Sequence, residues 1–352
     1  PGRRREARAM RVFITGGTGL VGRRLARRLA ERGDHPVVLS RQADRARLST
    51  GLRGVEVLQG DPTIPGGWEQ AVSGCDAIIN LVGHNVFAQR WTPEVKRRIR
   101  DSRVYGTENV VAAMNKAAQK PKVLVQASAI GYYGPRGDEE LSESSSPGSD
   151  FMAVLCREWE AASQAAESFG TRVAQVRIGV VLARGEGALG IMTPIFKYVP
   201  GGAAPVGSGD RSYLPGKGQQ WMSWIHVEDL VGILLMALDR PEASGPINGT
   251  APAPVRNADF SLELTHALRG WFFPRYVPFG PPDFMLRLIL GEVAEVITKG
   301  QRVLPARAQS IGYRFSFPDL AGALRDLFPR REVQRANRPK AKPAVATARN
   351  EL

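Results

Sequence analysis

The strongest chemical signal in this 352-residue sequence is a glycine-rich run between an apolar stretch and a helix-like stretch. Gly16, Gly19 and Gly22 recur every third residue directly after the apolar residues 12–14. Glycines at this spacing let the pyrophosphate of a dinucleotide approach the backbone, and the free N–H groups of a helix N-terminus favour an anion. The full predicted turn comprises Gly16, Gly17, Thr18, Gly19, Leu20, Val21 and Gly22. A strand before it and a helix after it predict a dinucleotide-binding turn.

The end of the second predicted strand indicates which nicotinamide dinucleotide to expect. An NAD site has an acidic residue there, about 20 residues beyond the glycines, which bonds the ribose 2′-hydroxyl. This sequence has Ser40 and Arg41 instead. A hydroxyl and a guanidinium suit the 2′-phosphate of NADP, because arginine offers a planar fork of donors with a permanent charge. We therefore expect NADP(H), with a solvated surface arginine as the alternative for Arg41.

These residues need a scaffold, and short β-branched runs alternate with helix-like stretches over the first half of the chain. The expected strands are residues 11–15, 36–40, 55–59, 77–81, 123–128 and 172–178, and the expected helices are residues 21–32, 68–73, 93–118 and 151–169. Strict alternation of strand and helix predicts an α/β fold with a doubly wound parallel sheet, the Rossmann arrangement.

The chain changes character after Gly185, where glycine and proline cluster. We expect residues 10–184 to form the NADP-binding domain, with a strand and a helix returning to it from residues 219–250. Residues 185–329 are then mainly a smaller α+β substrate lobe and C-terminal domain. The apolar stretch 284–297 is either a lid or an amphipathic core helix.

The formal net charge of +14 raises the question of nucleic-acid binding. Residues 1–10 hold four Arg and one Glu (+3) and residues 330–352 hold seven Lys or Arg and two Glu (+5), which leaves +6 for the body. Residues 1–9 and 330–352 are predicted to be a disordered basic leader and tail. Because no aromatic-interleaved basic patch accompanies them, we do not expect a nucleic-acid partner.

Cysteine and apolar content point to a reducing, cytoplasmic compartment. The sequence has two cysteines, four histidines, and neither a CxxC nor an HExxH motif, so no disulfide framework or metal site is expected. The longest clean apolar run, residues 230–238, is far shorter than the roughly 20 residues that cross a bilayer. A small-molecule substrate is the expected partner, and the sequence does not indicate an oligomeric state.

Further motifs carry a family resemblance. They are Asp61 and the runs at residues 80–83 (Asn-Leu-Val-Gly), 128–134 (Ser-Ala-Ile-Gly-Tyr-Tyr-Gly), 177–182, 224–230 and 248–252. Together they resemble the extended short-chain dehydrogenase/reductases, and more narrowly the atypical epimerase/dehydratase-like branch of the 39U type. The distinctive C-terminal domain of that branch, of unknown function, is matched by residues 300–305 and 312–318. The resemblance covers roughly residues 10–329.

The resemblance implies further contacts with the cofactor. Asp61 is expected to face the adenine, and Arg103 takes the place of the usual helix asparagine. His84 and Trp91 either reach the nicotinamide side or serve as a loop residue and a core indole. The residues expected to pass beneath the ribose and pyrophosphate are Asn80, Leu81, Val82 and Gly83.

The resemblance also exposes a gap in the expected catalytic machinery. In the wider superfamily a serine holds the substrate oxygen, a tyrosine relays the proton, and a lysine four residues later lowers the pKa of that tyrosine. Ser128 matches the serine, but Met152 and Cys156 stand where the tyrosine and lysine are expected. Methionine has no titratable proton, so the usual relay is impossible at that position.

Four side chains remain candidates for catalysis. Ser128 either binds substrate or bonds a neighbouring group, and Tyr132 and Tyr133 are either replacement phenols or aromatic lining of the pocket. Cys156 shares helical spacing with Trp159, which favours a packed core cysteine over a titrating thiol.

Two functions follow from these observations. The first is an NADP-dependent oxidoreductase or epimerase acting on a small carbonyl, an alcohol or a nucleotide-sugar-like substrate. The second is a non-catalytic NADPH-binding sensor or scaffold. The cofactor turn supports both, and the missing tyrosine–lysine pair keeps the second open.

Overall fold

The computed structural model describes residues 9–48, 50–198, 218–270, 288 and 291–329. The predicted basic tail at 330–352, all but one residue of the predicted leader, and most of the apolar stretch from 284 to 290 lie outside the described residues.

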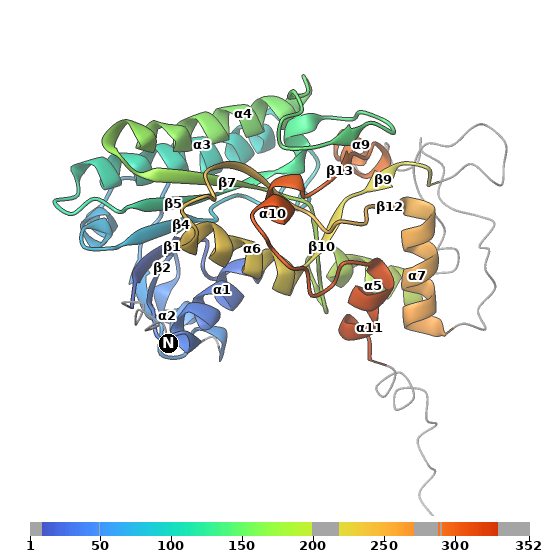
Figure 1. The fold of residues 1–352 in the computed structure, drawn as a ribbon, viewed down its shortest axis with the longest axis horizontal. Helices are drawn as coiled ribbons and strands as arrows, with labels where there is room; N and C mark the ends of the chain where they lie inside the picture. Colours follow the sequence, from blue (N-terminus) through green and yellow to red (C-terminus); the bar gives the residue numbers. More distant parts are fainter. Residues whose placement is uncertain (1–8, 49, 199–217, 271–287, 289–290, 330–352) are drawn as a thin grey trace, which may run out of the picture.

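A seven-stranded parallel sheet forms the centre of the fold (Figure 1). Its strand order is β11-β7-β5-β4-β1-β2-β3, and every neighbouring pair runs parallel. The strands are β1 (Arg11–Thr15), β2 (His35–Ser40), β3 (Glu56–Gln59), β4 (Ala77–Asn80), β5 (Val123–Ala129), β7 (Arg172–Ile178) and β11 (Gly245–Gly249). The predicted doubly wound α/β fold is confirmed.

Alternation of side chains along β1 explains why the sheet is covered on both faces. Val12 and Ile14 pack with α1 (Leu20–Glu31) and α6 (Val227–Asp239), whereas Phe13 packs on the other face against α3 (Pro93–Lys116). Successive side chains of a strand point to opposite faces, so a strand buried on both faces reads as a continuous apolar run. Helix α4 (Phe151–Gln164) lies beside α3, while α2 (Ala43–Arg47) lies near α1 (Figure 1).

Two predicted helices differ from the observed ones. Residues 67–72 form a 3₁₀ helix, η2 (Gly67–Val72), and the helix predicted to reach residue 169 ends as α4 before a second 3₁₀ helix, η4 (Ala165–Phe169). Gly170 follows with a φ of 86°, a backbone conformation that suits glycine and ends the helical path. Tight final turns of this kind are common at helix ends.

A second apolar cluster builds the smaller lobe at the carboxyl side of the sheet. Helices α5 (Gly187–Tyr198), α7 (Asn257–Arg269) and α11 (Leu320–Leu327) pack around Trp224 and Phe260, both fully buried. The remaining elements are η1 (Thr50–Leu52), η3 (Ile130–Tyr133), β6 (Glu140–Leu141), β8 (Val180–Ala183), β9 (Trp221–Met222), β10 (Trp224–His226), β12 (Val255–Arg256), α9 (Val293–Thr298), β13 (Arg302–Val303) and α10 (Ala306–Ser310).

Buried polar groups fasten the C-terminal segment onto the rest of the molecule. The Asp229 carboxylate on α6 accepts hydrogen bonds from the Tyr313 hydroxyl at 3.1 Å and from the backbone N–H groups of Ser316 and Phe317 at 2.8 and 2.9 Å. Glu143 Oε1 accepts from the backbone N–H groups of Asn248 and Arg307. The C-terminal segment is therefore an integral part of this fold.

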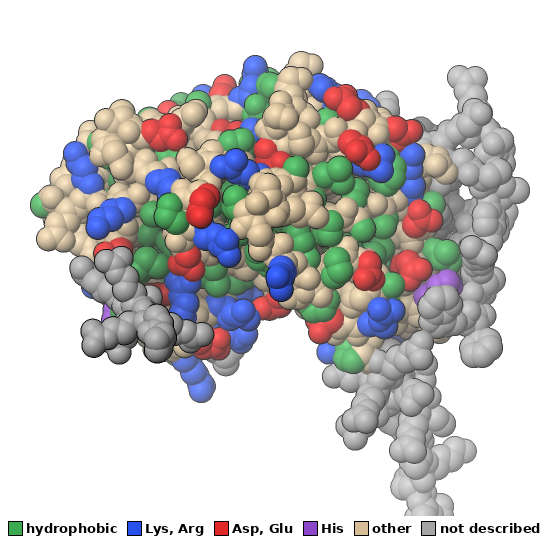
Figure 2. Space-filling view, in the orientation of Figure 1, with side chains coloured by type: hydrophobic (Ala, Val, Ile, Leu, Met, Phe, Trp, Pro, Cys, Tyr) green, Lys and Arg blue, Asp and Glu red, His purple; other side chains and the backbone are tan. Residues whose placement is uncertain are grey.

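The surface and the helix lengths bear on possible partners. Acidic and basic side chains are interspersed over the face shown in Figure 2, with arginines gathered over α1. Among the described residues, no helix has the length and apolar character to cross a membrane, and no cluster of ligating side chains could hold a metal ion.

Candidate functional site

Close packing explains three glycines in the turn between β1 and α1. Gly16 has a φ of 66°, and a Cβ there would lie 2.6 Å from the carbonyl oxygen of Leu81. A Cβ on Gly17 would lie 2.6 Å from the Val38 side chain, and one on Gly22 would lie 2.4 Å from the Gly16 oxygen. Such approaches are impossible for any larger residue, so these glycines bring α1 against β1, β2 and β4.

Gly19 is different, because the protein leaves space beside it. A Cβ there would meet only the Gly16 oxygen, at 3.2 Å, and both Thr18 and Gly19 are exposed. Gly19 is also the N-cap of α1, with no side-chain capping bond and no acidic residue in the first turn. Free N–H groups beside an open glycine are what an approaching pyrophosphate requires. The turn therefore fits a dinucleotide.

Helices α3, α4 and α11 carry the side-chain cap that α1 lacks, whereas α2, α7, α9 and α10 begin without one, as α1 does. The side chains of Thr92, Asp150 and Asp319 cap α3, α4 and α11, each accepting a bond from a backbone N–H of the first turn. Capping of this kind contributes about 1 kcal/mol to helix stability. An uncapped helix start at a sheet edge is a place where a ligand can supply the missing acceptor.

Ser40 and Arg41 lie where the sequence places them, at the carboxyl end of β2. The Ser40 hydroxyl oxygen accepts a bond from the backbone N–H of Gln42 at 3.1 Å, and the hydroxyl hydrogen stays available. Arg41 is exposed, and only its backbone carbonyl is engaged in the described part of the chain, by Gln59. Its guanidinium is therefore a cation without a carboxylate among the described residues.

The pKa of His84, just beyond β4, is affected by the positive charges at this edge of the sheet. Burial lowers the pKa of His84, and the positive charges of Arg98, Arg103 and Arg41 lower it further. Its Nε2 is buried and has no hydrogen-bond partner among the described residues. The edge between β2 and α3 is therefore electropositive, with a neutral imidazole inside it.

The Asn80 side chain lies inside the protein, although Asn80 is one of the residues expected to pass beneath the ribose and pyrophosphate. Its side chain is fully buried and donates to the Thr107 hydroxyl at 2.9 Å and to Gln126 Oε1 at 2.8 Å, while accepting from the Thr15 hydroxyl. All its polar atoms are thus used inside the protein. Contact with a cofactor at this position is limited to the backbone.

The other residues expected near the adenine half stay close to the turn. Asp61 is half-buried, and its Oδ1 accepts from the backbone N–H and the hydroxyl of Thr63, at 2.9 and 2.7 Å, which orders the loop after β3. Leu81 and Val82 are half-buried, and the Leu81 carbonyl lies directly against Gly16. The structure thus brings the ends of β1, β3 and β4 to one edge.

Arg103 crosses from α3 to the loop after β4. Its Nη1 donates to the carbonyl oxygens of His84 at 2.9 Å and Ile99 at 3.2 Å, and its Cζ lies 5.0 Å from the centroid of the Trp159 ring. A Cβ on Gly83 would lie 3.0 Å from Cζ, so Gly83 leaves room for the guanidinium. Burial lowers the pKa of Arg103 to about 10, which keeps it charged at neutral pH.

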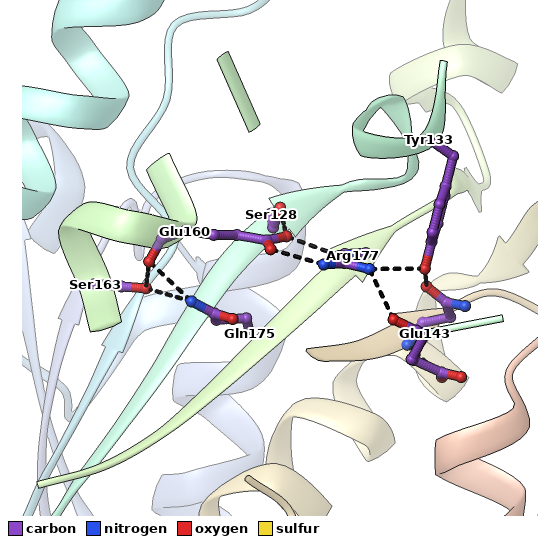
Figure 3. Close-up of polar contacts among 8 residues, drawn as sticks. Ser128, Tyr133, Glu143, Glu160, Ser163, Gln175 and Arg177 are labelled. Atoms are coloured by element: carbon purple, nitrogen blue, oxygen red, sulfur yellow. Dashed lines mark hydrogen bonds and ion pairs between the residues drawn. The ribbon is translucent and has the colours of Figure 1, made fainter. Parts of the chain in front are cut away.

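A buried ion pair occupies the middle of the candidate catalytic region (Figure 3). Arg177 on β7 donates through Nε and Nη2 to both oxygens of Glu160 on α4, each at 2.8 Å. The Ser128 hydroxyl donates to Glu160 Oε1 at 2.6 Å. The Tyr133 hydroxyl donates to Asn248 Oδ1 at 2.7 Å and accepts from Arg177 at 3.0 Å. Ser128 and Tyr133 are therefore tied into a structural network.

The protonation states in this network are fixed by their surroundings. Burial acts against the charge of Arg177, but the hydrogen bonds and negative charge of Glu160 outweigh it and raise the pKa of Arg177. Burial raises the pKa of Tyr133 to about 12. The Arg177 guanidinium stays charged and the Tyr133 phenol stays protonated at neutral pH, so neither titrates in the range where a proton relay works.

Cys156 is enclosed in the same way. Its side chain is 1% exposed, and burial followed by the charge of Glu160 raises the pKa of the thiol to about 12. It packs with Met152 against Gly131 of η3, just after β5. A thiol that stays protonated matches the packed core cysteine that its helical spacing favours.

Tyr132 is the most accessible of the four candidates. It is half-buried, its ring lies over Arg177 with Cζ 3.4 Å from the centroid, and it meets Tyr133 edge-on at 5.3 Å. No hydrogen bond of its hydroxyl occurs among the described residues. Within the described residues, the phenol of Tyr132 thus has no internal hydrogen-bonding role.

Sequence reasoning did not assign roles to Glu160 and Arg177, although both carried a signal. Glu160 falls on the buried face of α4 with Cys156 and Trp159, and Arg177 interrupts an apolar strand. Charged residues at buried positions must find a partner, because an unpaired buried charge is very costly. Their pairing across β7 and α4 follows from that rule.

Two family models match the chain. Residues 12–248 match the NAD dependent epimerase/dehydratase family, and residues 281–327 match a domain of unknown function, DUF1731. The chain belongs to the NAD-dependent epimerase/dehydratase family. The resemblance drawn from the motifs, including the distinctive C-terminal domain of this epimerase family, is confirmed.

Relatives of this epimerase-family chain extend over most of its length. It is 40% identical over 321 residues to the chloroplastic epimerase family protein SDR39U1 homolog of Arabidopsis thaliana, covering 90% of this chain and 86% of that protein. It is 36% identical to the epimerase family protein YfhF of Bacillus subtilis, covering 92% of this chain and all of the relative.

A crystal structure of the human epimerase family protein SDR39U1, isoform 2, with NADPH is similar in fold. The TM-score is 0.74 and the sequence identity 32%, with 90% of this chain and 99% of the human chain covered. The family fold therefore holds the nicotinamide cofactor NADPH in that relative.

Proposed function

We propose that this chain binds NADP(H) and acts as an oxidoreductase or epimerase on a small carbonyl, an alcohol or a nucleotide-sugar-like substrate. The observation that carries the proposal is the uncapped start of α1 beside Gly19, with Arg41 at the neighbouring strand end. Among the described residues, the Arg41 guanidinium has no carboxylate partner. An anion-accepting turn next to a free guanidinium suits a dinucleotide with an additional 2′-phosphate. The NADPH in the human relative supports the choice of cofactor.

Each part of the cofactor has residues to hold it. The backbone N–H groups at the start of α1 would bind the pyrophosphate, and Ser40 with Arg41 would bind the 2′-phosphate. Arg103 and His84 lie farther along the same edge, toward β5, where the nicotinamide half belongs. When bound, the nicotinamide supplies or accepts hydride.

A reaction that moves hydride to or from a carbonyl also needs a group that handles a proton. The hydroxyl groups of Ser128 and Tyr133 are buried and hydrogen bonded within the protein. Cys156 is buried too, and Met152 has no proton to give. We therefore assign the proton to Tyr132, whose hydroxyl is not engaged by the described residues. Arg177 holds the ring in place from below, and the buried Glu160 holds Arg177.

The hollow beside this region has the size of a small substrate. It measures about 320 Å³, near the lower end of the range for ligand pockets. It lies between the end of η3 and the start of α4 and is lined by Tyr133, Gly134, Pro135, Arg136, Pro147, Gly148, Ser149 and Asp150. Its volume favours a compact metabolite as the partner. We place the reaction in the cytoplasm, as the sequence predicts, whereas the Arabidopsis relative is named chloroplastic.

A second function is supported by the structural roles of the other three candidate catalytic residues. Because Ser128, Tyr133 and Cys156 serve the core, a protein with this arrangement could bind NADPH as a sensor or scaffold without turnover. The two functions share the cofactor site and differ only at Tyr132.

One experiment separates these functions. NADPH is mixed with a panel of small aldehydes, ketones and oxo acids, and the loss of reduced-nicotinamide absorbance is followed. Turnover that falls at least about 100-fold in Tyr132→Phe, the size expected for loss of a general acid, supports the enzyme. Tyr133→Phe is the matched control, since it removes a neighbouring phenol that serves the core and is expected to lower stability with a smaller effect on kcat.

The cofactor assignment has its own test. Arg41→Asp is expected to weaken NADPH binding at least about tenfold and leave NADH binding nearly unchanged, because only NADPH carries the 2′-phosphate. Dissociation constants from fluorescence titration check this. Equal losses for both dinucleotides would contradict the NADP assignment, and tight NADPH binding without turnover on any substrate would select the sensor.

A further inference from the structure

Arg103 carries a positive charge that no carboxylate balances within the described part of the chain. Only its Nη1 is hydrogen bonded there, and both acceptors are backbone carbonyl oxygens, of His84 and Ile99. Apart from burial, the one group that affects the pKa of Arg103 is the Cys156 thiol. That thiol is itself protonated at neutral pH, because its pKa is raised to about 12. The guanidinium charge therefore stays uncompensated.

The nearest obvious counter-ion is already used. Glu160 lies one helical turn beyond Cys156 on α4, but both of its oxygens bind Arg177, and Oε1 also accepts from Ser128. An exchange of partners would leave Arg177 buried without a counter-ion, which costs several kcal/mol. The structure thus keeps two cations and one anion in this region and assigns the anion to Arg177.

The position of Arg103 in the fold places this charge on the expected path of the dinucleotide. The guanidinium packs over Gly83 after β4 and beside Trp159 of α4, which covers the end of β5. In a doubly wound sheet the dinucleotide crosses the carboxyl edge from the glycine turn, with its adenine half beside β2 and its nicotinamide half toward β4 and β5. Arg103 therefore lies at the nicotinamide end.

The two redox forms of the cofactor differ in one charge at this end. The oxidised nicotinamide ring carries a positive charge and the reduced ring is neutral, whereas the phosphates, riboses and adenine are the same in both. A fixed cation near the ring repels the oxidised form, and at the effective dielectric constant of a protein edge one such charge lowers its affinity by roughly tenfold.

We propose that the uncompensated Arg103 guanidinium makes this chain selective for NADPH over NADP⁺. The proposal rests on the NADP(H) site proposed above and applies equally to an enzyme and to a sensor. In an enzyme it favours loading with NADPH and release of NADP⁺, while it opposes the positive charge that develops on the ring as hydride leaves. In a sensor it makes occupancy follow the reduced fraction of the NADP pool. The charge comes from α3, whereas the residue at the expected lysine position, Cys156, is neutral.

Binding constants test the proposal without any turnover. The full chain is titrated with NADPH, NADP⁺ and 2′-phospho-ADP, which keeps the adenine half and lacks the nicotinamide. The wild type is expected to bind NADPH at least about tenfold more tightly than NADP⁺. Arg103→Gln removes the charge and keeps a hydrogen-bonding side chain, so it should bring the two constants to within about threefold. Arg103→Lys keeps the charge and should keep the preference.

Arg41→Gln is the matched control, because it removes a guanidinium at the adenine end. It should weaken all three ligands alike and leave the ratio of the NADPH and NADP⁺ constants unchanged. The inference is overturned if the wild type binds both forms equally, or if Arg103→Gln keeps the full preference. A wild type that binds neither NADPH nor 2′-phospho-ADP contradicts the proposed function instead. A wild type without the preference overturns the inference even if Arg103→Gln does not fold.

Discussion

At the scale of single residues, the pair of Glu160 and Arg177 is the most sensitive point of the candidate site. Both side chains are nearly inaccessible, and both carboxylate oxygens are bonded. Removing one partner of a buried pair leaves the other charge uncompensated, which costs about 3–5 kcal/mol. Glu160→Gln is therefore expected to lower the free energy of unfolding by that amount, measured by urea denaturation.

A neighbouring glutamate on the same helix provides the control for that prediction. Glu158 pairs with Arg100 at 2.6 Å, but both side chains are more than a third exposed. Exposed pairs contribute less than about 1 kcal/mol, so Glu158→Gln should change the unfolding free energy little. Similar losses in the two variants would show that burial does not set the cost of breaking the pair.

The thiol of Cys156 predicts a pH dependence of stability. Burial raises its pKa from the ordinary 9.0 to about 12, so the folded state keeps a proton that the unfolded chain releases. The contribution is complete below pH 9 and is lost as pH rises from 9 toward 12, by up to about 1.4 kcal/mol per pH unit. Cys156→Ser should remove this part of the slope. Urea denaturation between pH 8 and pH 11 checks it, and identical slopes in both proteins would refute it.

At the scale of elements, the glycine turn separates packing from ligand binding. A Cβ at position 22 would lie 2.4 Å from the Gly16 oxygen, whereas one at position 19 would meet only that oxygen, at 3.2 Å. Gly22→Ala should therefore displace α1 and lower stability by about 2–3 kcal/mol, the usual cost of overpacking. Gly19→Ala should stay folded and bind NADPH at least about tenfold more weakly, because its methyl group fills the phosphate space.

Thermal melting and NADPH titration of the two variants distinguish these effects. A Gly19→Ala variant that binds NADPH like the wild type would contradict the assignment of the open turn to the pyrophosphate. A Gly22→Ala variant with wild-type stability would show that the helix can shift without loss.

At the scale of the whole molecule, one buried carboxylate on α6 holds residues 313–317 of the C-terminal segment. Asp229 is buried and accepts three hydrogen bonds from residues 313–317. Each buried donor left without an acceptor costs about 1–3 kcal/mol. Asp229→Ala should therefore release this segment, seen as faster hydrogen exchange at 313–317 while the amides of β1, β4 and β5 stay protected.

Asp326 gives the matched control for the docking of the C-terminal segment. It lies 3.3 Å from His226 Nε2 on the same side of the molecule, but its side chain is exposed. Asp326→Asn should leave the exchange of residues 313–317 unchanged, because exposed pairs contribute little. Uniformly faster exchange over the whole chain in Asp229→Ala would indicate global unfolding and contradict local release.

The amino-acid sequence by itself determined the fold and predicts the cofactor half of the site. Alternating apolar strands and amphipathic helices predict the parallel sheet, and Gly16, Gly19 and Gly22 with Ser40 and Arg41 predict an NADP turn. These signals are local: each depends on residues within one strand, one turn or one helix, where spacing alone fixes which side chains share a face. The sequence also located the vacant tyrosine and lysine positions at Met152 and Cys156.

Only the tertiary structure decided what the remaining polar residues do. Ser128, Tyr133 and Glu160 come from β5, η3 and α4, and Arg177 on β7 joins them through hydrogen bonds between residues 17–44 positions apart. Whether a hydroxyl faces a ligand or a buried carboxylate depends on how these elements pack, and no local pattern reports it. The same holds for the charge of Arg103, which stays unbalanced because Glu160 is bound to Arg177. The spacing of residues determines which face of a helix or strand a side chain is on, whereas three-dimensional packing determines which group that side chain contacts.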